Sequence, residues 1–182
     1  MADDFTLLYH EILDQVHKAK TKEQKVKLLK KYNTDGLRMV IKASFDPNIH
    51  WAVPEGEVPF RVNDAPDGTE HTRLATESKK LWHFIKGADK NINQNKRENM
   101  YIQMLEGLSA GEARVLNGAK DKALHKIYKG LSEFVVKEAF GWNDGYVVPD
   151  PNAPKETFDR QGNRIVASDS YPQLKGAANG VG

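Results

Sequence analysis

The sequence predicts an all-α protein, built as a compact multi-helix domain with a long proline- and glycine-rich loop (54–68) and an extended C-terminal tail. Apolar residues recur at spacings of three and four along most of residues 1–142, as in amphipathic helices. Ser, Thr or Asp precedes several of these segments, where helix caps are expected. From residue 143 the periodicity ends, while Pro, Gly, Asn and Ser become frequent. We therefore expect a helical domain at 1–142 and a low-complexity tail at 143–182.

Three short helices are expected before residue 46. Asp3 or Asp4 can cap the first helix. Thr21 and Gln24 form a capping box that opens the second. An Asn-Thr-Asp sequence caps the third, and an Asp-Pro-Asn sequence closes it because proline cannot continue a helix. The residues predicted to face inward are Phe5, Leu8, Ile12, Val16, Ala19, Val26, Leu29, Tyr32, Leu37, Val40, Ile41 and Phe45.

The middle of the chain is expected to pass through non-helical segments before the helices resume. Residues 49–53 are apolar and predicted to be an extended segment that plugs the core. The loop 54–68 contains three prolines and is long for a compact domain, which is often a sign of function. Thr69 or Thr72 is expected to cap a fourth helix, which Gly87 ends. Its inward residues would be Leu74, Leu81, Trp82 and Ile85.

Three further helices complete the predicted domain. One follows the polar stretch 89–95. Ser109 and Glu112 form a capping box for the next. Ser132 with Glu133 starts the last. The apolar residues of these helices are Tyr101, Met104, Leu105 and Leu108, then Val115, Leu116, Ala119 and Ala123, and finally Phe134, Val135, Ala139 and Phe140.

Composition excludes several classes of protein. The chain contains no cysteine, so disulfide frameworks and thiolate metal sites are excluded. No apolar run approaches the roughly 20 residues of a membrane helix. The N-terminus is acidic, unlike a signal peptide. We expect a soluble intracellular protein that makes no membrane contact.

The net charge is only +2, yet the bases are clustered. Between Gln15 and Phe45 nine bases stand against two acids, and smaller basic runs lie at 79–97 and 120–129. Clustered bases can bind nucleic-acid phosphates, although the solvated face of an amphipathic helix would look the same. The candidate nucleic-acid-binding residues are Lys22, Lys25, Lys27, Lys30, Lys31, Arg38, Lys42, Lys120 and Lys122.

Catalytic motifs are not found in the sequence. There is no phosphate-binding glycine loop and no Gly-x-Ser-x-Gly elbow. His10, Asp14 and His17 share a helix face that could hold a metal, but we interpret them as exposed polar residues, and likewise Glu70, His71 and Glu77. We therefore predict no enzyme activity, no metal and no cofactor. The aromatic residues Trp51, Trp82, Tyr101 and Trp142 are expected in the core, with stacking surfaces as the alternative.

Several segments resemble a family of small uncharacterised proteins of T-even-like tailed phages, chiefly those of marine cyanobacteria. They are 28–32, 45–47, 63–74, 104–108 and 112–113, and the resemblance covers about residues 5–142. More distantly, the pattern is similar to the helical DNA-binding domain of ATP-dependent DNA ligases. That similarity implies contacts with the backbone of duplex DNA through loops and helix starts. The chain lacks the ligases' adenylylation lysine motif, which excludes ligation.

Two hypotheses follow. The first is a non-enzymatic phage accessory protein in the host cytoplasm that binds nucleic acid or the replication and transcription machinery. The alternative is a virion or assembly component whose tail is ordered by docking on a neighbouring protein.

Overall fold

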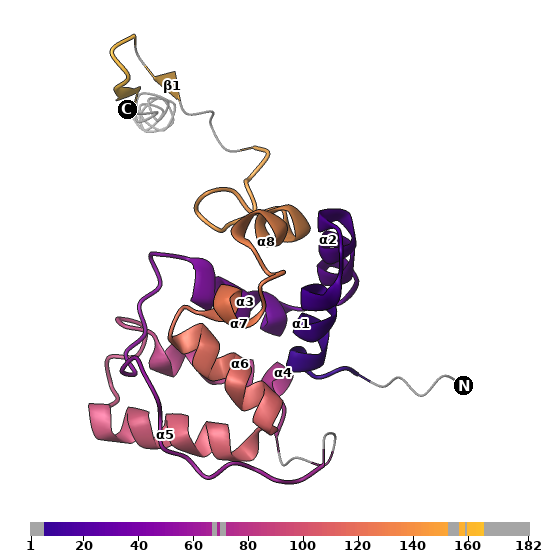
Figure 1. Cartoon of the computed structure of the whole chain (residues 1–182). Helices are drawn as coiled ribbons and strands as arrows, with labels where there is room; N and C mark the ends of the chain where they lie inside the picture. Colours follow the sequence, from indigo (N-terminus) through magenta and orange to yellow (C-terminus); the bar gives the residue numbers. More distant parts are fainter. Residues whose placement is uncertain (1–5, 67–68, 70–71, 153–156, 159, 166–182) are drawn as a thin grey trace, which may run out of the picture. The chain divides into compact units, whose positions relative to one another are not determined.

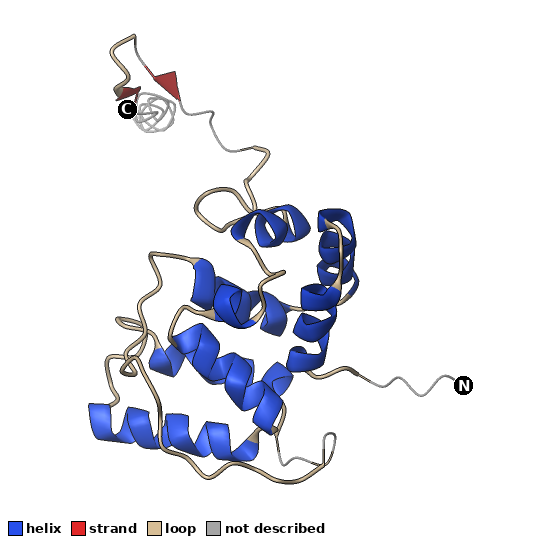
Figure 2. Ribbon diagram, viewed as in Figure 1, coloured by secondary structure: helices blue, strands red, loops and turns tan. Residues whose placement is uncertain are grey.

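The computed structural model describes residues 6–66, 69, 72–152, 157–158 and 160–165. The chain divides into two compact units, residues 1–148 and 149–182. The first unit therefore extends beyond the predicted boundary at 142, because Tyr146 is buried and its ring packs against that of Trp142. The predicted all-α class is confirmed, with helices throughout the described part of the first unit (Figure 2).

The first three helices are α1 (Tyr9–Lys18), α2 (Lys22–Lys31) and α3 (Asp35–Phe45) (Figure 1). The capping box of Thr21 and Gln24 is confirmed, and Thr34 caps α3. Helix α1 begins later than predicted, with Leu8 at its N-cap position. The expected caps Asp3 and Asp4 lie outside the described residues.

The segment after α3 enters the core as predicted, although it bends at residues 52–53 and is not one extended strand. Trp51 and Val53 are buried, and Trp51 forms a single antiparallel bridge with Ile85. The indole N–H of Trp51 donates to the carbonyl of Ala43 over 3.0 Å. The loop that follows contains no helix or strand within residues 54–66.

The predicted fourth helix is instead a single α-turn, α4 (Leu74–Glu77), continued by a 3₁₀ helix, η1 (Ser78–Phe84). Neither predicted threonine caps it: the Thr69 hydroxyl donates to the carbonyl of Pro66, and Arg73 occupies the N-cap position. Trp82 was predicted to face inward and is 48% exposed. The error lies in the assumed period, since a 3₁₀ helix repeats every three residues.

The remaining helices are α5 (Gln94–Gly107), α6 (Ala110–Lys120), α7 (Leu124–Ile127) and α8 (Glu133–Phe140). Ser109 and Ser132 cap α6 and α8 as predicted, whereas the sequence did not indicate α7. Phe134, on the outer side of α8, is 76% exposed. Helix α6 is the centre of the unit, because it packs against α1, α3, α5 and α7 (Figure 1).

Glu112 is buried within α6 and joins three helix starts. Its backbone N–H donates to Ser109, as in the predicted capping box. Its carboxylate accepts the N–H of Tyr9 at 3.0 Å and that of Leu74 at 2.9 Å, the first residues of α1 and α4. Glu112 therefore caps two other helices, where the negative charge also complements their dipoles.

The second unit contains a short antiparallel pair, β1 (Thr157–Phe158) and β2 (Arg164–Ile165), in which Thr157 faces Ile165. The sequence had indicated no regular structure in the tail. None of the helices in the described residues is long and apolar enough to cross a membrane.

Candidate nucleic-acid interface

Helix α2 presents a lysine-rich face to solvent. Its apolar residues Val26 and Leu29 are buried between α1 and α8, which fixes the orientation of the helix. Lys27, Lys30 and Lys31 are exposed beside this buried face, and they lie at the three- and four-residue spacings that bring helical side chains together. Glu23 is the one acidic residue within α2. The face therefore carries a net positive charge.

A hollow of about 470 Å³ lies beside the C-terminal end of this face. Lys31 and Tyr32 come from the end of α2, while Thr34 and Met39 come from the start of α3. The Lys31 ammonium lies 5.2 Å from the centre of the Tyr32 ring, within the range of a cation–π contact. Met39 is 44% exposed. The lining of the hollow thus combines apolar side chains with charged groups, among which Lys31 is basic and Asp35 is acidic.

A basic residue that the prediction omitted also reaches this hollow. Lys79, at the start of η1, lines it together with Ala75 and Ser78. Gly36 makes this approach possible, because a Cβ at that position would collide with the Tyr9 hydroxyl and with Ser78 Oγ. Lys79 and Lys31 line the same hollow only because of the tertiary structure. Their spacing along the chain could not indicate this.

Three other residues of the predicted basic set have different surroundings. The Arg38 guanidinium forms an ion pair with Asp35 and a hydrogen bond with Asn33. Lys25 and Lys42 are half-buried. Arg38 therefore offers a charge that Asp35 partly neutralises.

Lys22 connects α2 to α8. Its ammonium lies 2.7 Å from the carboxylate of Glu138, and both side chains are 53% exposed. The hydrogen bond from Lys22, followed by the charges of Lys22 and Lys30, lowers the pKa of Glu138. Lys22 is therefore already engaged within the protein, and the free lysine face consists of Lys27, Lys30 and Lys31.

Lys120 is used inside the fold and has no exposed surface on its side chain. Its ammonium donates to the carbonyls of Pro54 at 2.7 Å and Gly56 at 3.0 Å, and it pairs with Asp121. The Asp121 carboxylate in turn accepts the N–H of Gly56. No phosphate can reach a fully buried ammonium, so the prediction that Lys120 binds nucleic acid is wrong. Lys120 instead anchors the long loop.

Lys122 also has a structural role. Its ammonium donates to the carbonyls of Asp46 at 2.6 Å and Ala43 at 3.4 Å, at the C-terminal end of α3. A cation there satisfies terminal carbonyls and complements the helix dipole. Burial lowers the pKa of Lys122. This lysine therefore caps α3.

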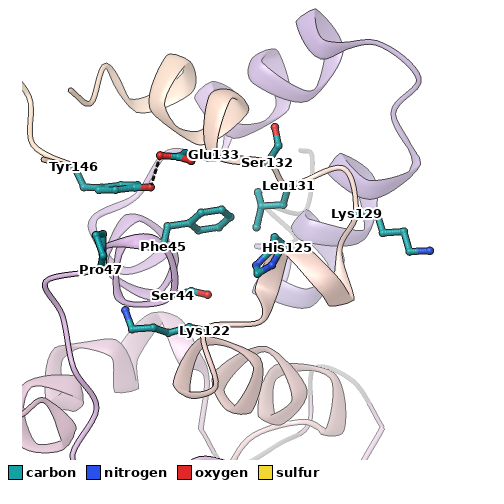
Figure 3. A pocket seen from close by; sticks show the side chains of 10 residues that line it. All are labelled: Ser44, Phe45, Pro47, Lys122, His125, Lys129, Leu131, Ser132, Glu133 and Tyr146. Atoms are coloured by element: carbon teal, nitrogen blue, oxygen red, sulfur yellow. Dashed lines mark hydrogen bonds between the residues drawn. The ribbon is translucent and has the colours of Figure 1, made fainter. Parts of the chain in front are cut away.

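Lys122 is one of the residues that line a second hollow, of about 500 Å³ (Figure 3). The His125 ring packs against Phe45, with centroids 6.2 Å apart, and the Tyr146 hydroxyl donates to Glu133 over 3.0 Å. The side chain of Lys129 extends away from the other labelled residues (Figure 3). Glu133 therefore joins α8 to the turn that follows it, while Lys122 binds carbonyls at the end of α3.

The lysine face lies within a stretch that matches a known family model. Residues 12–126 match a family of unknown function, DUF6433. The chain belongs to this family. No curated protein and no solved structure gives a significant match.

The DUF6433 region extends from Ile12 in α1 to Lys126 in α7. It therefore contains α2, α3 and η1, with both the lysine face and the adjoining hollow. It excludes α8, so the partner of Lys22 at Glu138 lies outside the matched region. Among the described residues of this DUF6433 member, no three histidine or acidic side chains converge to hold a metal ion.

Proposed function

We propose that this DUF6433 member is a non-enzymatic accessory protein of a tailed phage that binds nucleic acid through its phosphate backbone. The observation that carries the proposal is the exposed face of Lys27, Lys30 and Lys31 on α2, beside a hollow that Lys79 also lines. In the host cytoplasm such a protein would bind duplex DNA, alone or with the replication or transcription machinery. The phage origin rests on the sequence resemblance described above.

The chemistry of the face favours backbone contacts over base reading. Lysine is a compact charge that suits phosphate oxygens, whereas base edges are read mostly by arginine, asparagine and glutamine in fixed geometry. Arg38, next to the lysine face, is already paired with Asp35. We therefore expect affinity with little dependence on sequence.

A salt titration tests the proposal. The affinity of the full chain for a fluorescently labelled duplex is measured by anisotropy at increasing salt. The logarithm of the binding constant should fall linearly with the logarithm of salt concentration, with a slope of about −0.9 per neutralised phosphate. Absence of binding at low salt, or affinity that does not change with salt, would contradict the proposal.

A matched pair of variants locates the interface. Lys27→Gln/Lys30→Gln should weaken binding and make the salt slope shallower by about 1.8, the contribution of two phosphates. Lys126→Gln/Lys129→Gln removes the same charge from two other exposed lysines, in and after α7, and should leave the slope nearly unchanged. Equal losses in both variants would mean that net charge matters and the α2 face does not.

A virion or assembly role is the second candidate, favoured by exposed apolar residues near the end of the first unit. Phe134, Val147 and Val148 are 76%, 47% and 67% exposed. Such side chains suit a protein contact better than a phosphate backbone. Mass spectrometry of purified particles tests this role, and absence of the chain at stoichiometric level would exclude it.

A further inference from the structure

Trp82 is the most exposed of the three tryptophans, and its position follows from the 3₁₀ geometry of η1. Ser78, Leu81 and Phe84 are buried and recur every three residues. Lys79 and Trp82 lie one position later in the same repeat, so they share an adjacent face of the helix. Trp82 is 48% exposed there. The Trp82 ring is therefore exposed one helical turn from Lys79, which lines the hollow beside the lysine face of α2.

The ring of Trp82 packs against a neighbouring ring. It lies against the ring of His83, with centroids 3.9 Å apart and planes inclined by 30°. His83 Nδ1 lies 2.7 Å from a carboxylate oxygen of Asp89, which is itself buried. The other Asp89 oxygen accepts the N–H of Asn91. These hydrogen bonds therefore fix the orientation of His83, whose ring lies against the indole of Trp82.

Arg97 attaches this turn to α5. Its Nε donates to the carbonyl of His83 at 2.9 Å, and its Nη2 donates to the carbonyl of Asp89 at 3.1 Å. A platform held in this way loses little conformational entropy when a ligand stacks on it, which favours binding.

The stretch of chain that contains Trp82 is rich in basic residues. From Ser78 to Arg97 six bases stand against one acid, a local charge of +5. That acid, Asp89, is paired with His83, and the neighbouring Glu77 is paired with Lys80. Lys79, Lys86, Lys90 and Lys96 are all exposed. The complementary ligand is therefore an anion that also carries a flat apolar surface.

We propose that Trp82 is a stacking platform for an unpaired base of single-stranded nucleic acid, with the surrounding lysines contacting its phosphates. Each nucleotide supplies both a π-face and a negative charge. Bases within a duplex are already stacked on one another, so the ligand of this platform is a single strand. The inference rests on the proposed function and extends it, since Lys79 belongs to both surfaces.

Binding to oligothymidylate and to a duplex of equal length, measured by anisotropy, tests this platform. Trp82→Ala should lower the affinity for oligothymidylate by roughly 5- to 150-fold, the range found for loss of one base–aromatic stack. Duplex affinity should be unchanged. Trp82→Phe retains a ring and should keep most of the affinity while losing the quenching of tryptophan fluorescence by oligothymidylate. Trp142→Phe, a control at a half-buried tryptophan, should retain that quenching.

The outcomes separate the two proposals. If Trp82→Ala binds oligothymidylate as well as the natural chain while Lys27→Gln/Lys30→Gln loses affinity, the platform is excluded and backbone binding stands. If the natural chain binds neither nucleic acid at low salt, both proposals fail.

Tryptophan and lysine together also suit a lipid headgroup region. Quenching by anionic phospholipid vesicles and not by oligothymidylate would replace the base with a lipid.

Discussion

Single residues in this protein carry roles that depend on distant partners, and Glu112 is the clearest case. The hydrogen bond from its backbone N–H to the Ser109 side chain is predictable, because Ser109 lies three residues earlier. Its carboxylate, however, accepts N–H groups from Tyr9 and Leu74, which lie 103 and 38 residues away. Nothing in the local sequence indicates that a helix near the N-terminus will start against this side chain.

Glu112→Ala should lower the free energy of unfolding by about 2–6 kcal/mol, because two buried N–H groups lose their acceptor at about 1–3 kcal/mol each. Urea denaturation followed by circular dichroism measures the change. Glu55→Ala is the control, since this exposed loop residue should change stability by less than about 0.5 kcal/mol. A loss for Glu112→Ala no larger than for the control would contradict the bridging role.

Lys120→Met should release the start of the long loop without weakening nucleic-acid binding. The buried ammonium holds the carbonyls of Pro54 and Gly56, and methionine fills similar space without donating. Faster limited proteolysis between residues 54 and 66 is the expected result, at unchanged duplex affinity and salt slope. A shallower salt slope would instead mean that Lys120 contacts phosphate after all.

At the scale of elements, α8 is tied to the turn that follows it by a cluster around Glu133. Gly141, with φ of +66°, ends the helix in the left-handed conformation that glycine adopts without strain. The Tyr146 hydroxyl donates to Glu133, and the Lys137 ammonium lies 4.9 Å from the centre of the Tyr146 ring. Burial, followed by the hydrogen bond to Glu133, raises the pKa of Tyr146 to about 12.

This cluster should make stability depend on pH. Hydrogen bonds from Lys137 and then Tyr146 hold the pKa of Glu133 below its ordinary value of 4.5. Because folding lowers the pKa of this carboxyl group, its charge stabilises the folded state at pH values above the ordinary pKa. That stabilisation is lost as the pH falls through the lowered pKa of the folded state. The difference in melting temperature between the natural chain and Glu133→Gln should therefore be present at pH 7 and shrink below pH 4.5.

Asp144→Asn is the control for this series, because the Asp144 side chain is fully exposed although it also contacts Lys137. A Glu133→Gln difference that stays constant down to acid pH would show that the charge on Glu133 does not stabilise the fold.

At the scale of the whole molecule, the buried apolar residues of the described part of the chain all belong to the first unit. They run from Leu8 to Tyr146, and Val148 is exposed just before the boundary. A chain truncated after Val148 should therefore melt at the same temperature as the full chain and bind duplex DNA equally well, measured by circular dichroism and anisotropy. A clearly lower melting temperature would mean that the second unit contributes to the core.

Local patterns in the sequence were enough to predict most helices and their starts. Thr21, Thr34, Ser109 and Ser132 cap helices as expected, because a cap is satisfied by N–H groups two or three residues away. The buried faces of α2, α3, α5 and α6 likewise follow from helical spacing. The prediction failed at η1, where the chain takes a three-residue period that apolar spacing did not distinguish.

The sequence by itself therefore determined the helical class, most of the caps and the basic character of α2, since each of these depends on neighbours along the chain. Only the tertiary structure decided which charges are free. In the folded protein Lys120 is buried and Lys122 binds carbonyls at the end of α3. Lys79 lines the same hollow as Lys31, and the Trp82 side chain is exposed. The physical reason is that exposure and ionic partners depend on segments far apart in sequence, which only packing brings together.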